Sequence, residues 1–377
     1  MLLKTENKPI RVLQLFTTLN RGGAETMIMN YYRNIDRTKV QFDFTVHRQE
    51  KGAYEDEIDF LGGKIYRFLP FHPKNFIAYK RQISLFFDEH PEYQIIHGHV
   101  SHLGYFFYKE AKKRGIPCII IHSHNTGMDI DIKAPFHVYF KYVSCKYPTH
   151  YFSCGQKASE WLFGKRHDKK VHILKNAIDT KTFFYDKNIS YTVKKQINLE
   201  NKFVIGNIAR FSPQKNHSFL IDVFSEIYNK NKNSLLILVG DGQLRLQIEE
   251  KVKSLHLENA VLFLGIRQDI SELMQVFDVF LFPSLYEGLP VTLVEAQATG
   301  LKCIISDRVP DDIVIAPDLV EFISLKRSSL YWAEKVLKYE EGYNRKNTYV
   351  EIKNSGYDIL TNAKWLEQFY LDSITQK

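Results

Sequence analysis

The sequence has few cysteines, no long apolar run and no short-period repeat. Its four cysteines, Cys118, Cys145, Cys154 and Cys303, lack the paired spacing of a disulfide framework. We therefore expect them to be small buried side chains in a reducing compartment. No uninterrupted apolar stretch approaches the roughly 20 residues that a membrane-spanning helix needs, and the first residues are too polar for a signal peptide. These absences favour a cytoplasmic protein.

Length and composition indicate a globular protein of two domains. Of the 377 residues, 44% are hydrophobic and 25% are charged, as in ordinary globular chains. One hydrophobic core rarely serves so many residues. The net charge of +8 is uneven, because residues 1–185 hold 28 Lys and Arg against 18 Asp and Glu (+10), whereas residues 186–377 hold 23 against 25 (−2). The first half is therefore the basic one.

Aromatic and basic residues are mixed in this first half, notably in residues 71–81, and a cationic run follows at residues 109–114. Such segments can rest on an anionic membrane surface, so we expect peripheral contact with the inner face of the plasma membrane. The alternative is a solvated lysine-rich surface. No recognisable nucleic-acid-binding motif accompanies the charge, so no nucleic-acid partner is expected.

Apolar runs alternate with amphipathic stretches along the whole chain, which predicts parallel sheets covered by helices. We place a first α/β domain at residues 1–180 and a second at residues 185–350, and we expect a helical pattern over residues 344–370. The predicted strands are residues 10–16, 40–46, 64–68, 94–97, 118–121, 149–153 and 171–174 in the first domain, and residues 203–209, 235–239, 261–264, 279–282 and 303–306 in the second.

The most informative stretch is residues 284–300, SLYEGLPVTLVEAQATG. It places Glu287 just before an expected helix and Glu295 inside it, with the free backbone of Gly288 between them. Pro290 is expected to be the first helical residue, because its missing N–H would have no partner there. A helix N-terminus can hold a phosphate, and carboxylates accept hydrogen bonds from sugar hydroxyls. The stretch therefore predicts a site that binds both ends of a nucleotide-sugar.

The full string resembles the donor-site signature of retaining glycosyltransferases of family 4, which have the GT-B fold: two Rossmann-like domains facing across a cleft. Residues 175–183 resemble the hinge of that family, with Ala177 in place of the usual glycine. Residues 210–216 resemble its Gly-Arg-Leu-x-x-x-Lys-Gly/Asn segment. The resemblance covers nearly the whole chain, and it implies that a last helix at about residues 355–377 packs back on the first domain.

The resemblance assigns most site residues to the second domain. Arg210 and Lys215 would stabilise the negative charge of the departing nucleoside diphosphate. Glu287 would bind sugar hydroxyls, and the segment before Arg267 would meet the nucleobase through its main chain. The expected donor-binding residues are Gly22, Gly23, Gly240, Arg267, Gly288, Leu289, Pro290, Thr292 and, for the ribose, Glu295.

Glycines follow predicted strands in both domains. Gly22 and Gly23 resemble the glycine-rich first loop of the family, where the main chain would approach the sugar and diphosphate. The alternative there is a turn that needs positive φ. Gly240 and Gly242 resemble the family's Gly-x-Gly turn, with a plain tight turn as the alternative. The missing third glycine argues against a dehydrogenase.

Histidines gather after two predicted strands of the first domain, as His97, His99 and His102 and as His122 and His124. No cysteine or acidic partner accompanies them at ligand spacing, so no metal and no cofactor is expected. In the resembled family a histidine in this place faces the donor sugar. We prefer His124 for that role and keep His122 as the alternative, with His99 in the same cleft. Histidines that merely pack at strand ends are the remaining alternative.

The triplet Asp129-Ile130-Asp131 matches the Asp-x-Asp pattern with which metal-dependent GT-A transferases hold Mg²⁺ or Mn²⁺. It follows a histidine-containing loop, and nothing around it suggests the architecture of that other class. We interpret it as a solvated loop or as part of the acceptor side.

The resemblance implies a retaining enzyme that moves a hexose or related sugar from a nucleotide-sugar, UDP-linked, to a saccharide on a polyprenyl diphosphate. Residues 295–307 and 122–125 look closest to exopolysaccharide and capsule transferases. Two alternatives stay open: a sugar-nucleotide epimerase with the same fold, and a donor-binding subunit without turnover. Products formed without any acceptor would reveal the first, and substitutions at Glu287 or Lys215 test the second.

Overall fold

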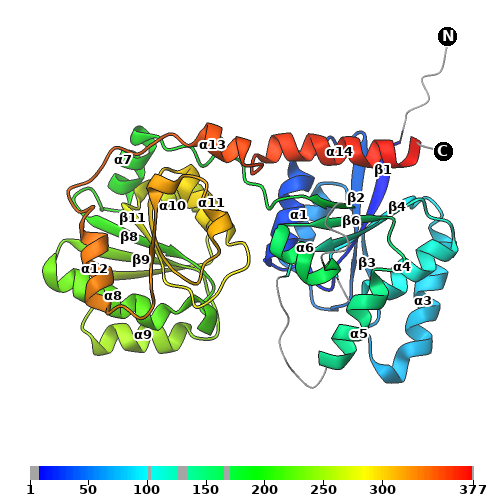
Figure 1. The fold of residues 1–377 in the computed structure, drawn as a ribbon, viewed down its shortest axis with the longest axis horizontal. Coiled ribbons are helices and arrows are strands. Elements are labelled where there is room, and N and C mark those ends of the chain that lie inside the picture. Colours follow the sequence, from blue (N-terminus) through cyan, green and yellow to red (C-terminus); the bar gives the residue numbers. More distant parts are fainter. Residues whose placement is uncertain (1–7, 101–102, 126–133, 165–169, 376–377) are drawn as a thin grey trace, which may run out of the picture. The chain divides into compact units, whose positions relative to one another are not determined.

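The computed structural model describes the chain except residues 1–7, 101–102, 126–133, 165–169 and 376–377. The fold comprises two compact units, Met1–Ala177 with Ile359–Lys377, and Ile178–Asp358. Each unit is a parallel sheet with helices on both faces (Figure 1). No helix among the described residues is both long enough and apolar enough to cross a membrane.

The first unit has a seven-stranded sheet in the order β3-β2-β1-β4-β5-β6-β7, and all neighbouring strands are parallel. The strand order reverses between β1 and β4, which is where open parallel sheets bind ligands beyond their carboxyl ends. The strands are β1 (Ile10–Leu15), β2 (Val40–Val46), β3 (Ile65–Arg67), β4 (Ile95–Gly98), β5 (Cys118–Ser123), β6 (His150–Ser153) and β7 (Val171–Ile173).

The two faces of this sheet pack against different helices, because successive side chains of a strand point to opposite faces. Val12 and Ile120 pack with α1 and α14, whereas Leu13 and Ile119 pack with α3, α4 and α6. The helices of this unit are α1 (Gly23–Asn34), α2 (Glu55–Phe60), the 3₁₀ turn η1 (Pro73–Asn75), α3 (Phe76–Glu89), α4 (Gly104–Lys113), α5 (Ala134–Ser144), α6 (Gln156–Phe163) and α14 (Ile359–Thr375).

The helical pattern expected over residues 344–370 corresponds to two helices, α13 (Tyr349–Asn354) and α14. Gly356 has a φ of 76°, the left-handed conformation that ends helices, and Asp358 then forms a parallel bridge with Ile178. The break coincides with the boundary between the two units.

The last helix packs on the first unit through one stripe of side chains. Ile359, Ala363, Leu366 and Tyr370 recur at helical spacing and are essentially inaccessible to solvent. Among the aromatic residues of this helix, Tyr370 is fully buried, whereas Trp365 is 43% exposed. The anchor is therefore centred on Tyr370.

The second unit has a six-stranded parallel sheet in the order β10-β9-β8-β11-β12-β13, which reverses between β8 and β11. The edge strand β13 was not expected from the sequence, because it is short and three of its four residues are partly exposed. The strands are β8 (Phe203–Ile208), β9 (Ser234–Val239), β10 (Val261–Gly265), β11 (Val279–Phe282), β12 (Lys302–Ser306) and β13 (Val320–Ile323).

The core of the second unit is also divided between the two faces of its sheet. Ile237 and Phe280 pack with α10 and α11, whereas Leu236 and Leu281 pack with α8, α9 and α12. The helices are α7 (Lys187–Gln196), η3 (Pro213–Lys215), α8 (His217–Lys230), α9 (Arg245–Ser254), α10 (Ile270–Val276), α11 (Val291–Ala298), η4 (Asp311–Ile313), η5 (Pro317–Leu319), α12 (Ser329–Leu337) and α13.

Candidate functional site

Two loops meet where the strand order of the second sheet reverses. β8 and β11 are neighbours, and the segments that follow them carry Lys215 and Glu287. The Nζ atom of Lys215 lies 2.6 Å from Oε1 of Glu287, and the Glu287 side chain is only 5% exposed. The structure thus joins two predicted site residues in one ion pair at the place where such sheets bind ligands.

Main-chain hydrogen bonds hold these two loops together. The Leu285 N–H donates to the carbonyl of Gln214 over 2.8 Å, and the Gln214 amide donates to the carbonyl of Tyr286 over 2.9 Å. The same amide lies 3.3 Å from Oε2 of Glu287. Asn216, in a left-handed conformation with a φ of 54°, donates to the carbonyl of Pro283. Both oxygens of the Glu287 carboxylate are therefore held, Oε1 by Lys215 and Oε2 by Gln214.

Arg210 differs from Lys215 in its surroundings. Its side chain is exposed, and within the part of the chain that the structure describes it forms no ion pair and no side-chain hydrogen bond. Its position directly after β8 puts it at the same edge of the sheet as the Lys215 loop. One predicted cation is thus open to an incoming anion, and the other is already paired.

Gly240 is required by a close approach of two backbones. Its φ is 134°, and a Cβ atom there would lie 2.1 Å from the carbonyl oxygen of Ala209. A Cβ on Gly242 would lie 2.5 Å from the carbonyl oxygen of Phe211. The Gly-x-Gly segment therefore lets the loop after β9 pack directly on the loop after β8, which goes beyond a plain tight turn.

The helix α11 begins one residue later than expected. Pro290 has a ψ of 101° and is the residue before the helix, so the prediction that it is the first helical residue is wrong by one position. Gly288, Leu289 and Thr292 are partly exposed around this N-terminus. The first N–H groups of α11 therefore lie beside partly exposed residues.

Glu295 lies in the second turn of α11 and is largely, though not fully, shielded from solvent. Burial raises the pKa of its carboxyl group to about 7. Among the described residues, no side chain donates a hydrogen bond or forms an ion pair with this carboxylate. A buried carboxylate without a partner is costly, so this group favours a ligand that donates hydrogen bonds to it.

Arg267 follows β10 and is exposed, and its guanidinium donates to the Asp269 carboxylate with an Nε–Oδ1 distance of 2.8 Å. Its side chain is therefore held beside α10. This arrangement leaves the main chain of the segment as its candidate contact with a nucleobase.

Gly22 and Gly23 lie at the N-terminus of α1 in the first unit. Gly22 precedes the helix with a φ of −99°, and neither glycine has a positive φ, so the alternative of a turn that needs one is wrong. A Cβ on Gly22 would lie 2.3 Å from a carboxylate oxygen of Glu25, whereas a Cβ on Gly23 would meet nothing within 4 Å. Gly23 therefore leaves open space at the start of the helix.

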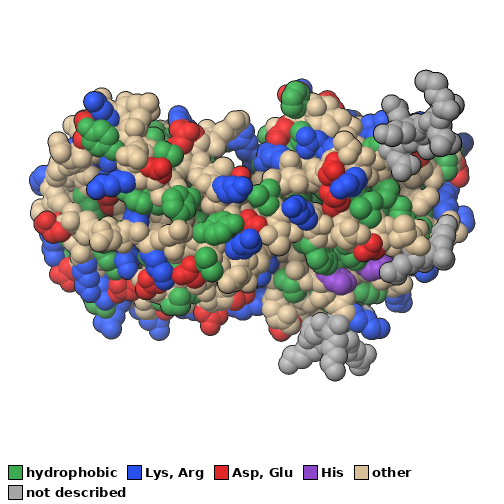
Figure 2. All heavy atoms as spheres, turned by 90° about the horizontal axis from the view of Figure 1, so that it is seen from above, with side chains coloured by type: hydrophobic (Ala, Val, Ile, Leu, Met, Phe, Trp, Pro, Cys, Tyr) green, Lys and Arg blue, Asp and Glu red, His purple; other side chains and the backbone are tan. Residues whose placement is uncertain are grey.

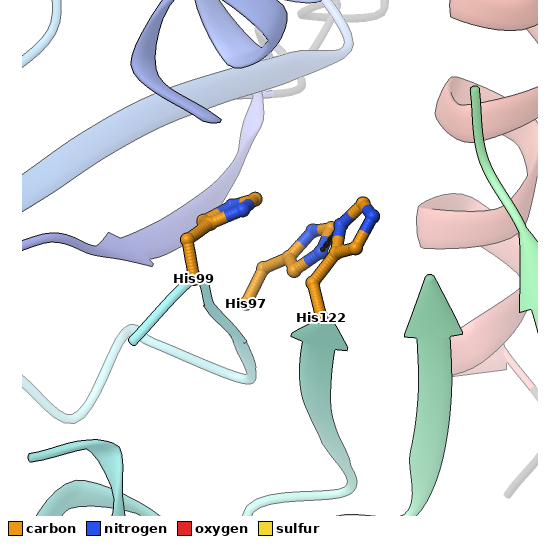
Figure 3. A group of neighbouring side chains, drawn as sticks. All are labelled: His97, His99 and His122. Carbon is orange, nitrogen blue, oxygen red and sulfur yellow. Dashed lines mark hydrogen bonds between the residues drawn. The ribbon is translucent and has the colours of Figure 1, made fainter. Parts of the chain in front are cut away.

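The four histidines that the structure describes at the ends of β4 and β5 form one cluster, and Figure 3 shows three of them, His97, His99 and His122. Nε2 of His97 lies 3.0 Å from Nδ1 of His122, and Nδ1 of His99 lies 2.8 Å from Nε2 of His124. Burial lowers the pKa of all four imidazoles, that of His124 to about 3. All four rings are therefore neutral near pH 7.

Three of these rings offer nitrogens that lie within 4.8 Å of one another, namely those of His97, His99 and His122. The rings are stacked, however, with interplanar angles of 24° for His97–His99 and 13° for His97–His122. Imidazole lone pairs lie in the ring planes, so stacking holds these lone pairs in nearly parallel planes, whereas metal ligation needs them to converge on one point. The described geometry is that of a hydrogen-bonded stack, and the absence of a metal remains a prediction. Asp129, Asp131 and His102 lie outside the described residues.

The sequence comparisons decide the family. Residues 21–182 match the family described as Glycosyltransferase Family 4, and residues 191–354 match Glycosyl transferases group 1. Glycosyltransferase EpsF of Bacillus subtilis strain 168 is 35% identical over 369 residues, which cover 96% of each chain. The chain belongs to the family 4 (group 1) glycosyltransferases.

Further relatives of this glycosyltransferase agree with its fold and enzyme class. An Escherichia coli UDP-Gal:alpha-D-GlcNAc-diphosphoundecaprenol alpha-1,3-galactosyltransferase is 24% identical over 89% of this chain and 91% of its own. The crystal structure of Anabaena HepE in complex with UDP superimposes with a TM-score of 0.77 at 17% identity, covering 96% of this chain and all of the other. The glycosyltransferase therefore has the GT-B fold and is a transferase.

Sequence reasoning missed three residues of these clusters in the glycosyltransferase. Gln214 supports Glu287, and Gln14 and Tyr370 contact the histidines. Gln14 carried a signal, since it is a polar residue inside an apolar strand. Nothing in the sequence indicated a polar role for Tyr370, because an aromatic residue in an amphipathic helix indicates packing.

Proposed function

We propose that this glycosyltransferase transfers a hexose or related sugar from a UDP-sugar to a saccharide acceptor on polyprenyl diphosphate, with retention of anomeric configuration. The supporting observation is the Lys215–Glu287 pair beside the N-terminus of α11, at the reversal point of the second sheet. The Escherichia coli relative is named for UDP-galactose and a diphosphoundecaprenol-linked acceptor, and the HepE structure contains UDP. Exopolysaccharide or capsule synthesis is the proposed pathway.

In this proposal the second unit holds the donor. The N–H groups at the start of α11 and the free guanidinium of Arg210 bind the diphosphate, because both concentrate positive charge at one edge of the sheet. Glu295 accepts hydrogen bonds from the ribose. Glu287, fixed by Lys215 and Gln214, accepts hydrogen bonds from sugar hydroxyls.

The proposed chemistry needs no side-chain base. The acceptor hydroxyl oxygen bonds to the anomeric carbon as the bond from that carbon to the diphosphate oxygen breaks. The proton of the hydroxyl passes to the departing phosphate oxygen on the same face, so atoms and charge balance. Arg210 and Lys215 stabilise the negative charge on the leaving diphosphate, and His124 hydrogen-bonds the sugar, with His122 and His99 beside it.

Two other functions use the same fold. A sugar-nucleotide epimerase would convert the donor without any acceptor, and a donor-binding subunit would bind it without turnover. The Escherichia coli relative is named as a galactosyltransferase, which favours transfer over both. Analysis of the products with and without acceptor separates the three functions in one experiment.

Binding of the donor is tested by a panel of nucleotide-sugars in a thermal unfolding assay, with and without EDTA. A ligand that binds only the native state at 100 times its Kd stabilises the protein by about 2.7 kcal/mol. We expect a UDP-sugar to raise the melting temperature by several degrees, and we expect EDTA to leave that shift unchanged, because no metal is proposed at the site. A panel without any shift contradicts the donor assignment, and a shift lost with EDTA contradicts the absence of a metal.

A membrane contact is proposed for the first unit, at the start of α3. Phe76 and Ile77 are 40% and 82% exposed beside Lys74 and Arg81, around a surface hollow of about 550 Å³. Tyr139 and Tyr142 are exposed on α5, and α4 packs between α3 and α5. On the surface that Figure 2 shows, Lys and Arg side chains are mostly interspersed with Asp and Glu. Apolar and basic side chains thus combine at α3 in the manner of an interfacial helix.

Replacing Ile77 by glutamate is expected to weaken sedimentation with phosphatidylserine vesicles at least fivefold, because it removes apolar area and adds repulsion. Leu246→Glu is the matched control, since Leu246 is a 74% exposed apolar residue on α9 of the other unit. Equal vesicle binding by both variants and the unmodified protein contradicts the proposed contact. Thermal unfolding reports on folding in each case.

A further inference from the structure

One face of the first sheet changes from apolar to polar as its strands approach their carboxyl ends. On β1 the sequence runs from Val12 to Gln14, and on β4 it runs from Ile95 to His97. On β5 the same face changes from Ile120 to the histidines that follow. Gln14 and His97 are register partners across the reversal point of the strand order, and α14 covers this face. The polar stripe therefore lies where such sheets bind ligands.

Six side chains of this stripe form one continuous chain of hydrogen bonds. Oε1 of Gln14 lies 2.9 Å from Nε2 of His99, and Nε2 of Gln14 lies 3.5 Å from the hydroxyl oxygen of Tyr370. The same hydroxyl lies 2.6 Å from Nδ1 of His97. With the His97–His122 and His99–His124 contacts described above, Gln14 connects two arms, each of which ends in an imidazole.

The neutrality of the rings couples the directions of all the bonds in this chain, so the orientation of the Gln14 amide sets them together. A neutral imidazole has one N–H and one lone pair, so a ring that donates through one nitrogen must accept through the other. From the oxygen of Gln14, His99 donates to Gln14 and His124 donates to His99, so Nδ1 of His124 ends that arm as an acceptor. This arm therefore presents a lone pair.

The other arm ends with the opposite role. The Gln14 amide donates to the Tyr370 hydroxyl, which donates to His97, and His97 donates to His122. Nε2 of His122 therefore ends this arm as an N–H donor. Turning the Gln14 amide around reverses every bond at once, so one end still donates and the other still accepts.

Both ends of the chain lack a partner among the described residues. Nε2 of His122 and Nδ1 of His124 are buried without a hydrogen bond, and their rings are stacked with centroids 4.2 Å apart. Leaving a buried donor or acceptor unpaired costs about 1–3 kcal/mol. A donor and an acceptor side by side suit hydroxyl groups, which both donate and accept, and a sugar carries several of them.

We propose that Gln14 and Tyr370 are positioning residues that give His122 and His124 opposite hydrogen-bonding roles toward hydroxyl groups of the transferred sugar. The proposal rests on the proposed function for the presence of a sugar. His122 and His124 then both contact the sugar, one as a donor and one as an acceptor, so no choice between them is needed. Gln14 and Tyr370 themselves touch no substrate and act through the tautomers of the rings.

The tautomers are measured by ¹⁵N NMR of the whole protein labelled at histidine. Tyr370→Phe removes the group that holds Nδ1 of His97, so we expect His97 and His122 to populate both tautomers while His99 and His124 keep one. In Gln14→Leu we expect the histidines of both arms to populate both tautomers. Tyr32→Phe is the matched control, because its buried hydroxyl bonds Gln41 on the same side of the sheet and lies outside the chain.

Activity is then compared with UDP binding. We expect Tyr370→Phe to lower kcat for sugar transfer at least tenfold while the Kd of UDP, which has no sugar, changes less than twofold. Unchanged tautomers or an unchanged kcat in Tyr370→Phe overturns the proposal, and Gln14→Leu serves the same test if Tyr370→Phe does not fold. If the unmodified protein transfers no sugar, the proposed function fails. The spectra then decide alone, and a single retained tautomer of His122 in Tyr370→Phe overturns the chain.

Discussion

Replacing Lys215 by methionine is expected to lower the kcat of sugar transfer by about 10²–10³-fold, the usual cost of removing one charged group that stabilises a transition state. The ammonium lies 2.6 Å from Glu287 at the edge of the sheet where the diphosphate is proposed to leave. Methionine keeps most of the side-chain volume and the contact with the Phe282 ring, which lies 5.0 Å from Nζ. The loss would therefore come from the missing charge.

The same substitution is also expected to reduce stability, because it leaves the Glu287 carboxylate almost buried without its counterion. Breaking such a pair costs roughly 3–5 kcal/mol when it is fully buried, and about 2–3 kcal/mol is expected here because the Lys215 side chain is 18% exposed. Low activity in Lys215→Met alone would thus have two explanations. A second substitution is needed to separate them.

The double variant Lys215→Met/Glu287→Gln separates catalysis from folding. It replaces the pair by neutral groups of similar size, which is often neutral for stability, so the melting temperature should recover while transfer stays lost. Lys230→Met is the control, since Lys230 of α8 forms an exposed pair with Glu334 of α12 and its replacement should change neither quantity. Recovery of activity with stability in the double variant would contradict a catalytic role for the pair.

Local patterns in the sequence predicted most strands, because parallel strands buried on both faces are short continuous apolar runs. Val40–Val46 and Val279–Phe282 agree with the structure to the residue. The strand β13 was not predicted, because it lies at the sheet edge and its residues are partly exposed. The start of the last helix near residue 355 was predicted from the resemblance alone, because a single glycine such as Gly356 does not reveal whether a helix ends or continues.

The candidate site was predictable in its residues and not in its contacts. The string around Glu287 predicted a donor-binding loop, but the ion pair with Lys215 depends on the pairing of β8 with β11, which follows from the strand order. The histidine chain depends in the same way on β1 lying beside β4, and on α14 returning more than 350 residues later in the chain, since Gln14 and Tyr370 are separated by 356 positions. Such contacts are fixed by topology and leave no local signature.

Changing Glu295 to glutamine is expected to stabilise the unliganded protein at pH 8 and to weaken its binding of a UDP-sugar. Burial raises the pKa of the Glu295 carboxyl to about 7, above the ordinary value of 4.5. The native state therefore favours the protonated form. The contribution of this group to stability is complete below pH 4.5 and is lost as the pH rises through about 7.

The size of this pKa shift sets the expected change in stability. Each pKa unit corresponds to about 1.4 kcal/mol, and some solvent reaches the side chain, so we expect Glu295→Gln to raise the free energy of unfolding at pH 8 by about 2 kcal/mol. At pH 5 the two proteins should be nearly equal in stability. Urea unfolding of both proteins at the two pH values measures the difference, and a destabilised variant at pH 8 would contradict the unpartnered carboxylate.

Donor binding should show the opposite dependence, because only the ionised carboxylate accepts both ribose hydroxyl hydrogens. For UDP-glucose, whose diphosphate diester does not titrate in this range, the Kd should rise about tenfold for each pH unit below 7. In Glu295→Gln the Kd should be higher at pH 8 and independent of pH. A pH-dependent Kd that persists in this variant would place the titrating group elsewhere, whereas a flat profile in both proteins would mean that the ribose does not meet Glu295. If Glu295→Gln stabilises the protein and weakens UDP-sugar binding, the buried charge of Glu295 serves ligand binding at the expense of stability.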